Sequence, residues 1–314
     1  MSALPFPPAE AAVSEAIVDT MQSIFGVHRG FRPVHAKGIV CEGSFQAAPA
    51  ARALSRAPYL QGTTVPVLAR FSNFSGLPTV ADADPTASPH GLALRFQLAA
   101  GASTDLVAHS YDGFPVATAD EFLAFLRALA ASGPGVPAPT PLQQFAANRP
   151  AVRRFLEATP PPRSFATQAY FGVDAFRFTN QQQQSRVGRL RLLPLAGELR
   201  LSAAEAAQRP HDFLFDELAV RLERGPAQFR LSVQLAAPGD PIEDPTQAWP
   251  AAREQFELGS LRVVQLHADS FALQQSLHFD PARLPDGIAP ADPLLAVRSA
   301  VYAVAGRRRQ LAAA

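Results

Sequence analysis

The chain has almost no cysteine, because Cys41 is the only one among 314 residues. A single thiol excludes an internal disulfide and agrees with a reducing compartment. The sequence also has no strong excess of charge, since 28 lysines and arginines stand against 27 aspartates and glutamates. A formal net charge of +1 gives no field that would favour nucleic acid or a membrane surface as the partner. The expected partner is therefore a small molecule.

Long apolar runs are missing as well. No stretch reaches the ~18 uninterrupted apolar residues that a membrane span requires. Residues 1–22 have no basic segment, and they carry glutamates and an aspartate where a signal peptide needs an apolar core. We therefore expect a cytoplasmic protein that does not enter a membrane. With 47% hydrophobic residues the chain can bury a substantial core in one large domain or at most two, and of these we expect one domain over residues 1–314.

Several segments have the pattern of helices. Residues 8–26 carry a short apolar stripe that stops at Gly26. Residues 118–131 begin with Thr118 as N-cap, and Glu121 three positions later predicts a capping box. Further helices are expected over 142–158, over 212–224 and after the turn "LPDGIAPADP" near the C-terminus.

Other segments have the pattern of short strands separated by Gly, Pro and Asp clusters. They include "VPVLARFS" (65–72), "GLALRFQL" (91–98) and "TDLVAHSY" (104–111). "AYFGVDAFRFTN" and "RVGRLRLLPL" alternate like two strands of a hairpin joined by "QQQQS", and two more strands follow the helix at 212–224. Seven or eight antiparallel strands, with helices inserted late and at the end, predict an α+β fold. A closed barrel would hide the strand edges.

The last helix, within "ADPLLAVRSAVYAVAGRRRQ", places a tyrosine between arginines. At about 100° per residue, one stripe carries Arg298, Tyr302, Ala305 and Arg309. A fixed positive charge beside a phenol favours phenolate, a hard ligand that suits ferric iron and is one of the known axial ligands of haem. Arg309 could then reach a propionate across the gap at Ala305. The same stripe also fits an amphipathic terminal helix with a solvated basic tail, so the helix alone leaves both interpretations open.

A second segment, "FRPVHAKGIVCEGSF" (31–45), contains His35, which by itself could equally be a core residue. However, "RPVHAKG" resembles the distal-histidine segment of the haem catalases, and "VPVLARFSNFSG" resembles the strand that follows it. Five further segments resemble later catalase segments and follow in the same order: "SPHGLALRF", "TDLVAHS", "AYFGVDAFRFTN", "PIEDPTQAWP" and "LHFDPARLPDGIAPADPLLAVRSAVY". Because the resemblance covers about residues 28–309, the sequence is identified as a member of the haem catalase superfamily. It is most like the short catalase-related peroxidases.

The resemblance implies a catalase-like closed antiparallel β-barrel of about eight strands with added helices. It also implies haem b (heme b) with ferric iron as the cofactor, Tyr302 as the iron ligand, and Arg298 as the residue that holds Tyr302 as phenolate. His35 matches the distal acid/base group, and Ser72 matches the serine that fixes the tautomer of its imidazole. The other matched positions are Arg32, Arg70 and Arg309 for the propionates, and Val34, Phe114 and Phe122 on the distal side of the haem.

Two departures from larger catalases bear on the reaction. Alignment of "DLVAHSYDGF" places His109 where catalases carry a distal asparagine, so a second imidazole is expected to act on the orientation of peroxide. The chain is also expected to lack the N-terminal arm and the C-terminal helical domain of larger catalases. That loss would widen the approach to the haem and leave a monomer or a simple homo-oligomer.

The resemblance implies a haem-dependent peroxidase of the oxidative stress response. It would reduce hydrogen peroxide or organic hydroperoxides with an external organic reductant through a ferryl intermediate. One alternative is a true catalase of minimal length, which disproportionates hydrogen peroxide. A second is a hydroperoxide lyase or isomerase of the allene-oxide-synthase type, which needs no reductant, and a third is a haem-binding protein without peroxide turnover.

Overall fold

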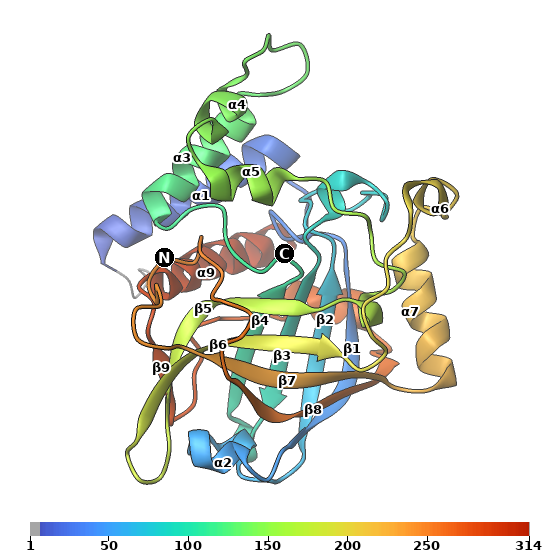
Figure 1. Cartoon of the computed structure of the whole chain (residues 1–314). Helices are drawn as coiled ribbons and strands as arrows, with labels where there is room; N and C mark the ends of the chain where they lie inside the picture. Colours follow the sequence, from blue (N-terminus) through green and yellow to red (C-terminus); the bar gives the residue numbers. More distant parts are fainter. Residues whose placement is uncertain (1–6, 314) are drawn as a thin grey trace.

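The computed structural model describes residues 7–313 and contains one antiparallel sheet closed into a barrel (Figure 1). The barrel strands are β1 (Gly38–Ala47), β2 (Val65–Ser72), β3 (Gly91–Gln97), β4 (Ser103–His109), β5 (Tyr170–Thr179), β6 (Ser185–Pro194), β7 (Ala227–Leu235) and β8 (Gln255–Leu266). Their order is β4-β3-β2-β1-β8-β7-β6-β5, and the barrel closes where His109 of β4 pairs with Phe171 of β5. A short strand, β9 (Ile288–Pro290), adds to β5. The predicted eight-stranded α+β barrel is confirmed.

The barrel encloses a packed core. Phe45, Phe71 and Phe229 are completely buried in it, and Phe45 meets Phe96 edge to face with ring centroids 5.4 Å apart. Side chains of alternate residues point to the other face of a strand. On that outer face a separate apolar cluster includes Ala93 of β3 and Val107 of β4. The barrel interior is therefore filled, and room for a ligand has to lie outside it.

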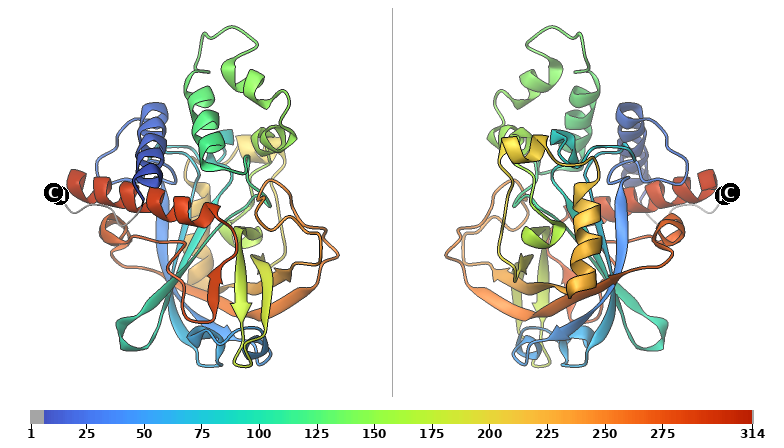
Figure 2. Two further views of the ribbon diagram at one scale, coloured as in Figure 1. Left: turned by 90° about the vertical axis from the view of Figure 1, so that its left-hand side faces the viewer. Right: turned by 90° about the vertical axis from the view of Figure 1, so that its right-hand side faces the viewer.

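Helices cover one side of the barrel. A second apolar core joins α1 (Pro8–Phe25) to α3 (Ala119–Ala130), with Met21 and Phe125 among its buried side chains. The terminal helix α9 (Leu294–Ala313) crosses α1, as Figure 2 shows. The shorter α8 (Ser270–Ser276) contacts both α9 and β1. No helix in the stretch from residue 7 to residue 313 is both long enough and apolar enough to span a membrane.

The remaining helices lie at the periphery. They are α2 (Ala51–Leu54), α4 (Pro141–Ala146), α5 (Pro150–Leu156), α6 (Ala203–Ala207) and α7 (Phe213–Arg224). The expectation of one helix over 142–158 is wrong, because α4 and α5 are separate. Pro150 disfavours helical backbone angles at the residue before it, and Arg149 has φ −125° and ψ 88°.

The capping box expected at the start of α3 is only half formed. Thr118 Oγ1 accepts a hydrogen bond from the amide of Glu121 at 3.2 Å, as expected of an N-cap. The Glu121 carboxylate instead accepts from the amide of Ala117 at 3.1 Å, one residue before the N-cap.

Candidate functional site

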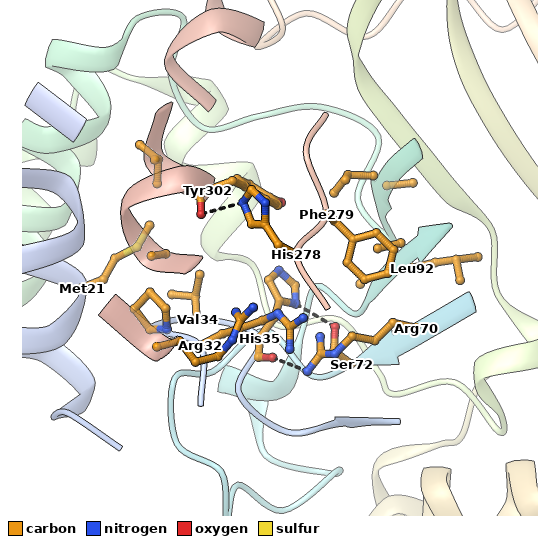
Figure 3. Close-up of a pocket in the computed structure, with 18 residues that line it drawn as sticks. Met21, Arg32, Val34, His35, Arg70, Ser72, Leu92, His278, Phe279 and Tyr302 are labelled. Carbon is orange, nitrogen blue, oxygen red and sulfur yellow. Dashed lines mark hydrogen bonds between the residues drawn. The ribbon is translucent and has the colours of Figure 1, made fainter. Parts of the chain in front are cut away.

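A cavity that is open to solvent lies between the outer face of the barrel and helices α1 and α9 (Figure 3), and the empty space in it and at its mouth is about 740 Å³. Its apolar walls include Met21, Val34, Leu92, Ala93, Val107, Phe279, Val301 and Ala305. Its polar side chains are Arg32, His35, Arg70, Ser72, His278, Tyr302 and Arg309. Seven of the residues expected at the site, from Arg32 to Arg309, thus meet at one cavity although they are far apart in the sequence.

His35 lies in the loop between α1 and β1. Its Nδ1 is 3.1 Å from Oγ of Ser72, the last residue of β2. The backbone of His35 is left-handed, with φ 55°, which costs roughly 1–3 kcal/mol in a residue other than glycine. Its amide donates to the carbonyl of Phe74 at 2.7 Å, so the surrounding loops hold this conformation. The imidazole is therefore placed by the backbone on one side and by the serine hydroxyl on the other.

The imidazole of His35 is uncharged near neutral pH. Burial, together with the nearby Arg70, His109 and Arg32, lowers the pKa of His35 from 6.5 to about 3. A neutral imidazole has one nitrogen that accepts a proton and one that donates. His35 can thus act both as a base and, after taking a proton, as an acid.

Arg32, Arg70 and Arg309 form a wall of positive charge, called here the arginine cluster. Arg32 and Arg309 both donate to the carbonyl oxygen of Leu277, at 2.8 and 3.0 Å, and Arg70 donates to Oε1 of Gln274 at 2.8 Å. Among the residues that the structure describes, no carboxylate forms an ion pair with any of the three.

This concentration of charge favours an anionic ligand. Burial lowers the pKa of Arg32 well below its usual value, and repulsion by Arg70 and Arg309 lowers it further. Burial and repulsion by Arg309 likewise lower the pKa of Arg70 to about 9. A buried positive charge without a partner of opposite charge lowers the stability of the fold. An anion placed against the arginine cluster would therefore be bound strongly.

Tyr302 faces the cavity from α9, and Arg298 lies one helical turn before it. Arg298 forms an ion pair with the buried carboxylate of Asp174. Burial lowers the pKa of Arg298, but the charges of Asp174 and Tyr302 and their hydrogen bonds outweigh burial and raise it above the usual value. A guanidinium with a permanent charge is thus fixed next to the phenol.

Several cavity residues were not anticipated, among them His278 and Met21. Nε2 of His278 lies 3.0 Å from the carbonyl oxygen of Tyr302, and a dashed line marks this contact in Figure 3. Met21 reaches the cavity from α1. The apolar stripe of the first helix was the one available signal for Met21, and nothing in the spacing of the sequence connects His278 to Tyr302.

His109 does not line the cavity but lies beside it, paired with Gly91 across β3 and β4. Burial and the charge of Arg298 lower the pKa of His109 to about 3, so this imidazole is also neutral. Its Nδ1 accepts a hydrogen bond from the amide of Tyr111 at 3.3 Å, and the hydrogen of the ring is therefore on Nε2. In residues 7–313 no acceptor is found for Nε2.

Phe114, Phe122 and Arg298 also stand outside the cavity wall. Phe114 and Phe122 contact each other, with ring centroids 5.2 Å apart, in the apolar cluster that also includes Val34. They support the wall from behind instead of forming it.

The cavity fits a haem. The part of the chain from residue 7 to residue 313 contains no group of three His, Cys, Asp or Glu side chains that could hold a metal ion. An iron ion bound by the single oxygen of Tyr302 would therefore need its other ligands from a macrocycle. The apolar walls suit a flat porphyrin, and the arginine cluster supplies the charge that two propionates require.

Comparison with known proteins agrees with this site. The sequence pattern of the family described as Catalase matches residues 23–313. The chain is 34% identical to the catalase-related peroxidase of Synechococcus elongatus over 306 residues, which cover 96% of this chain and 90% of that protein. It is 36% identical to the catalase-related peroxidase of Mycolicibacterium paratuberculosis over 297 residues, which cover 93% of each chain.

A larger relative matches over part of its length. Catalase-2 of Bacillus subtilis is 28% identical over 294 residues, which cover 86% of this chain but only 42% of that protein. The match to the family pattern over nearly the whole chain, and the two relatives matched almost end to end, agree with the cavity described above. This chain therefore belongs to the catalase family.

Proposed function

We propose that this chain is a haem-dependent peroxidase that reduces hydrogen peroxide or organic hydroperoxides with an external organic reductant. The observation that carries the proposal is that His35, Tyr302 and the arginine cluster line the same cavity. Membership of the catalase family implies a haem and an oxidoreductase that acts on peroxide, and the names of both catalase-related peroxidases support the peroxidase reaction. Its single cysteine and small net charge support a cytoplasmic setting and small-molecule partners.

The cofactor proposed is haem b. Tyr302 would bind its iron, and the charge of Arg298 would keep the phenol in its anionic form. The arginine cluster would pair with the two propionates. Bound haem supplies the redox chemistry, in which the oxidising equivalents of the peroxide are stored and then passed to the reductant.

His35 moves the proton. A neutral imidazole can take the proton from one peroxide oxygen and return it to the other, which leaves as water or as an alcohol. The hydroxyl of Ser72 keeps the ring in one orientation during both transfers. Val34, with Phe114 and Phe122 packed behind it, would narrow the space above the ring and limit how peroxide approaches.

His109, which lies beside the cavity, would act on the orientation of the peroxide, because its Nε2–H has no acceptor among the described residues. We expect this imidazole to hold a second peroxide less firmly than the asparagine of larger catalases. Disproportionation needs that firm hold, whereas oxidation of an organic donor does not. Peroxidation should therefore outweigh oxygen evolution.

The test is to add hydrogen peroxide to the haem-loaded protein and to measure oxygen evolution and then dye oxidation. Slow oxygen evolution with ready dye oxidation is expected, and His109→Asn should shift the ratio toward oxygen. Oxygen evolution at ~10⁷–10⁸ M⁻¹s⁻¹ would identify a minimal catalase instead. Rearrangement of a fatty-acid hydroperoxide without any reductant would identify the lyase or isomerase, and no turnover of either peroxide would contradict an enzymatic role.

A further inference from the structure

Two buried carboxyl groups lie close to Arg298. Asp174, in β5, is 1% exposed, and Asp292, two residues before α9, is 3% exposed. The backbone brings them side by side, because the amide of Ala291 donates to the carbonyl of Ala175 at 2.9 Å. Ionisation of both carboxyl groups would cost free energy, because they are buried away from water and their negative charges would repel each other.

The local backbone structure orients the side chains of Asp174 and Asp292. The pairing of β5 with β6 shifts register between Phe171 and Ala175, so Asp174 lies in an irregular part of the strand. Such bulges turn side chains away from the regular alternation of a strand. Oδ2 of Asp174 then accepts from Arg298, and Oδ1 of Asp292 accepts from the amide of Leu294 at 2.8 Å.

Each carboxyl group has one oxygen left over. Oδ1 of Asp174 and Oδ2 of Asp292 are buried, and no donor in the described chain reaches either of them. The other cation nearby, Arg189, donates to the backbone carbonyls of Gln247, Pro241 and Asp244 and forms no ion pair with a described carboxylate. A buried oxygen without a hydrogen-bond donor costs free energy. A proton shared between these two oxygens would give both of them a hydrogen-bond partner.

We propose that at mildly acidic pH Asp292 keeps its proton and donates it to Asp174, so that the pair then carries one negative charge, which balances Arg298. Asp292 is then a positioning residue, because it acts through Asp174 on Arg298 and so on Tyr302. That consequence rests on the proposed function, whereas the shared proton does not.

The charges around Asp292 support this assignment. The groups that face it are Asp174 from β5, Arg298 from α9 and Arg189 from β6. Burial and the charge of Asp174 raise the pKa of Asp292 to about 6, against the opposing effect of the two arginines. Below that pH the pair holds one negative charge, and above it a second negative charge develops beside Arg298.

The first test uses the full chain without haem, with the carboxyl carbons of aspartate labelled with ¹³C. Nuclear magnetic resonance identifies the Asp292 signal by its absence in Asp292→Asn. We expect the signal to titrate near pH 6, whereas ordinary aspartates titrate near ~3.9. A midpoint close to that ordinary value would overturn the proposal, and this measurement needs no change at position 174.

Asp174→Asn then separates pairing from burial. Its amide can donate to Asp292 and stabilise the ionised carboxylate, so the Asp292 midpoint should fall by more than one pH unit. An unchanged midpoint would mean that burial alone holds the proton, and the shared hydrogen bond would be wrong.

The last test follows the ferric absorption spectrum of the haem-loaded protein from pH 5 to pH 8. We expect the wild-type spectrum to change with the same midpoint as the Asp292 signal. Asp292→Asn, which keeps a donor at every pH, should show no such change. The control is Asp286→Asn, because the Asp286 side chain is 75% exposed in the same segment and should leave the spectral titration as in wild type.

A spectral titration that persists in Asp292→Asn would overturn the link to Arg298. Failure of the chain to bind haem would count against the proposed function, but the carbon titration would still decide whether the proton is shared.

Discussion

Arg298 and the arginine cluster lie close to the same cavity, but their charges have different partners. Arg298 has a carboxylate partner inside the protein, Asp174, and its charge is compensated before any ligand arrives. Within residues 7–313, the partners of the arginine cluster are neutral carbonyl and amide oxygens, such as the carbonyl of Leu277. Arg298 is therefore part of the folded framework, whereas an anionic ligand would complete the charge of the arginine cluster. Residue-scale predictions follow from this difference and from the neutral histidines.

Replacing Tyr302 with phenylalanine should abolish haem retention or change the coordination of the iron, because no carboxyl group and no other phenol lines the described cavity. Arg298→Ala should weaken haem binding in the same direction. Absorption spectra and haem content of the purified variants measure both effects. Tyr59→Phe, at a buried tyrosine of the barrel core, is the matched control. A wild-type haem spectrum in Tyr302→Phe would remove the central claim.

Replacing His35 with alanine should leave haem bound but slow the spectral change that hydrogen peroxide produces. We expect a loss of roughly 10²–10⁴-fold, which is typical of a positioned acid/base group. Stopped-flow mixing measures the rate, and His211→Ala, at an exposed histidine, should behave as wild type. An unchanged rate in His35→Ala would mean that another group, with His109 the nearest candidate, carries the proton.

In Asp292→Asn, which removes the carboxyl titration expected near pH 6, the rate of the same peroxide reaction should not change between pH 5 and pH 8. Burial lowers the pKa of both His35 and His109 to about 3, so both rings are already neutral throughout that range. The rate should fall only as the pH approaches 3, where the protonated His35 can no longer accept a proton. A rate profile with a midpoint near 6.5, the ordinary value for histidine, would show that His35 is not buried as described.

At the scale of elements, the site depends on the neighbouring ends of β2, β3 and β4, which lie against the loop between α1 and β1. Ser72 ends β2, Gly91 begins β3 and His109 ends β4, and these residues are neighbours in the sheet. The loop that carries His35 lies against this edge. Because the adjoining strands are hydrogen-bonded in register, a small change at one strand end moves the groups on its neighbours.

Gly91→Ala should disturb this edge. A Cβ at position 91 would lie 2.7 Å from Oγ of Ser72 and 2.9 Å from Nδ1 of His35, closer than real Cβ contacts allow. Ser72 and His35 would have to move apart, and a misplacement of a catalytic side chain by about 1 Å can slow a reaction by ~10²-fold. We expect normal haem content with a slow peroxide reaction. Gly133→Ala is the control because nothing lies within 4 Å of its Cβ position. Equal rates in the two variants would contradict the close packing.

For the whole molecule, the closed barrel acts as a rigid base and the helices form the other wall of the cavity. The barrel interior is packed with aromatic side chains, so the ligand site lies between its outer face and α1 and α9. The cavity walls come from residues 21 to 309, and haem would connect all of these segments. Haem binding should therefore stabilise the whole fold.

We expect haem to raise the thermal unfolding temperature by about 5 °C. A ligand at 100 times its dissociation constant that binds only the folded state contributes about 2.7 kcal/mol, and each kcal/mol shifts the midpoint by roughly 2–4 °C or less in a chain of this size. Arg309→Met should reduce the gain, since it removes one positive charge from the arginine cluster. Arg307→Met, which loses only an ion pair with Glu15, should retain it. Calorimetry of loaded and haem-free protein measures the difference, and equal gains in both variants would contradict the role of the cluster.

The sequence by itself determined the local elements and one stripe of the site. Period-two alternation defined the hairpin of β5 and β6, and helical spacing placed Tyr302, Ala305 and Arg309 on one face of α9. These features depend on neighbours within about one or two turns, which backbone geometry fixes for any sequence. Ordered motifs of a known family added His35, Ser72 and the arginines, but spacing alone did not bring them together.

Tertiary structure decided the rest. The contact between His35 and Ser72 joins residues 37 positions apart, and His278 meets the carbonyl of Tyr302 across 24 positions. The register shift in β5 that brings Asp174 beside Asp292 depends on how β5 pairs with β6. Contacts of this kind, and the burial that keeps His35 neutral and leaves the arginine cluster without carboxylates, exist only once the barrel closes and α9 packs against it. No local pattern of residues specifies them.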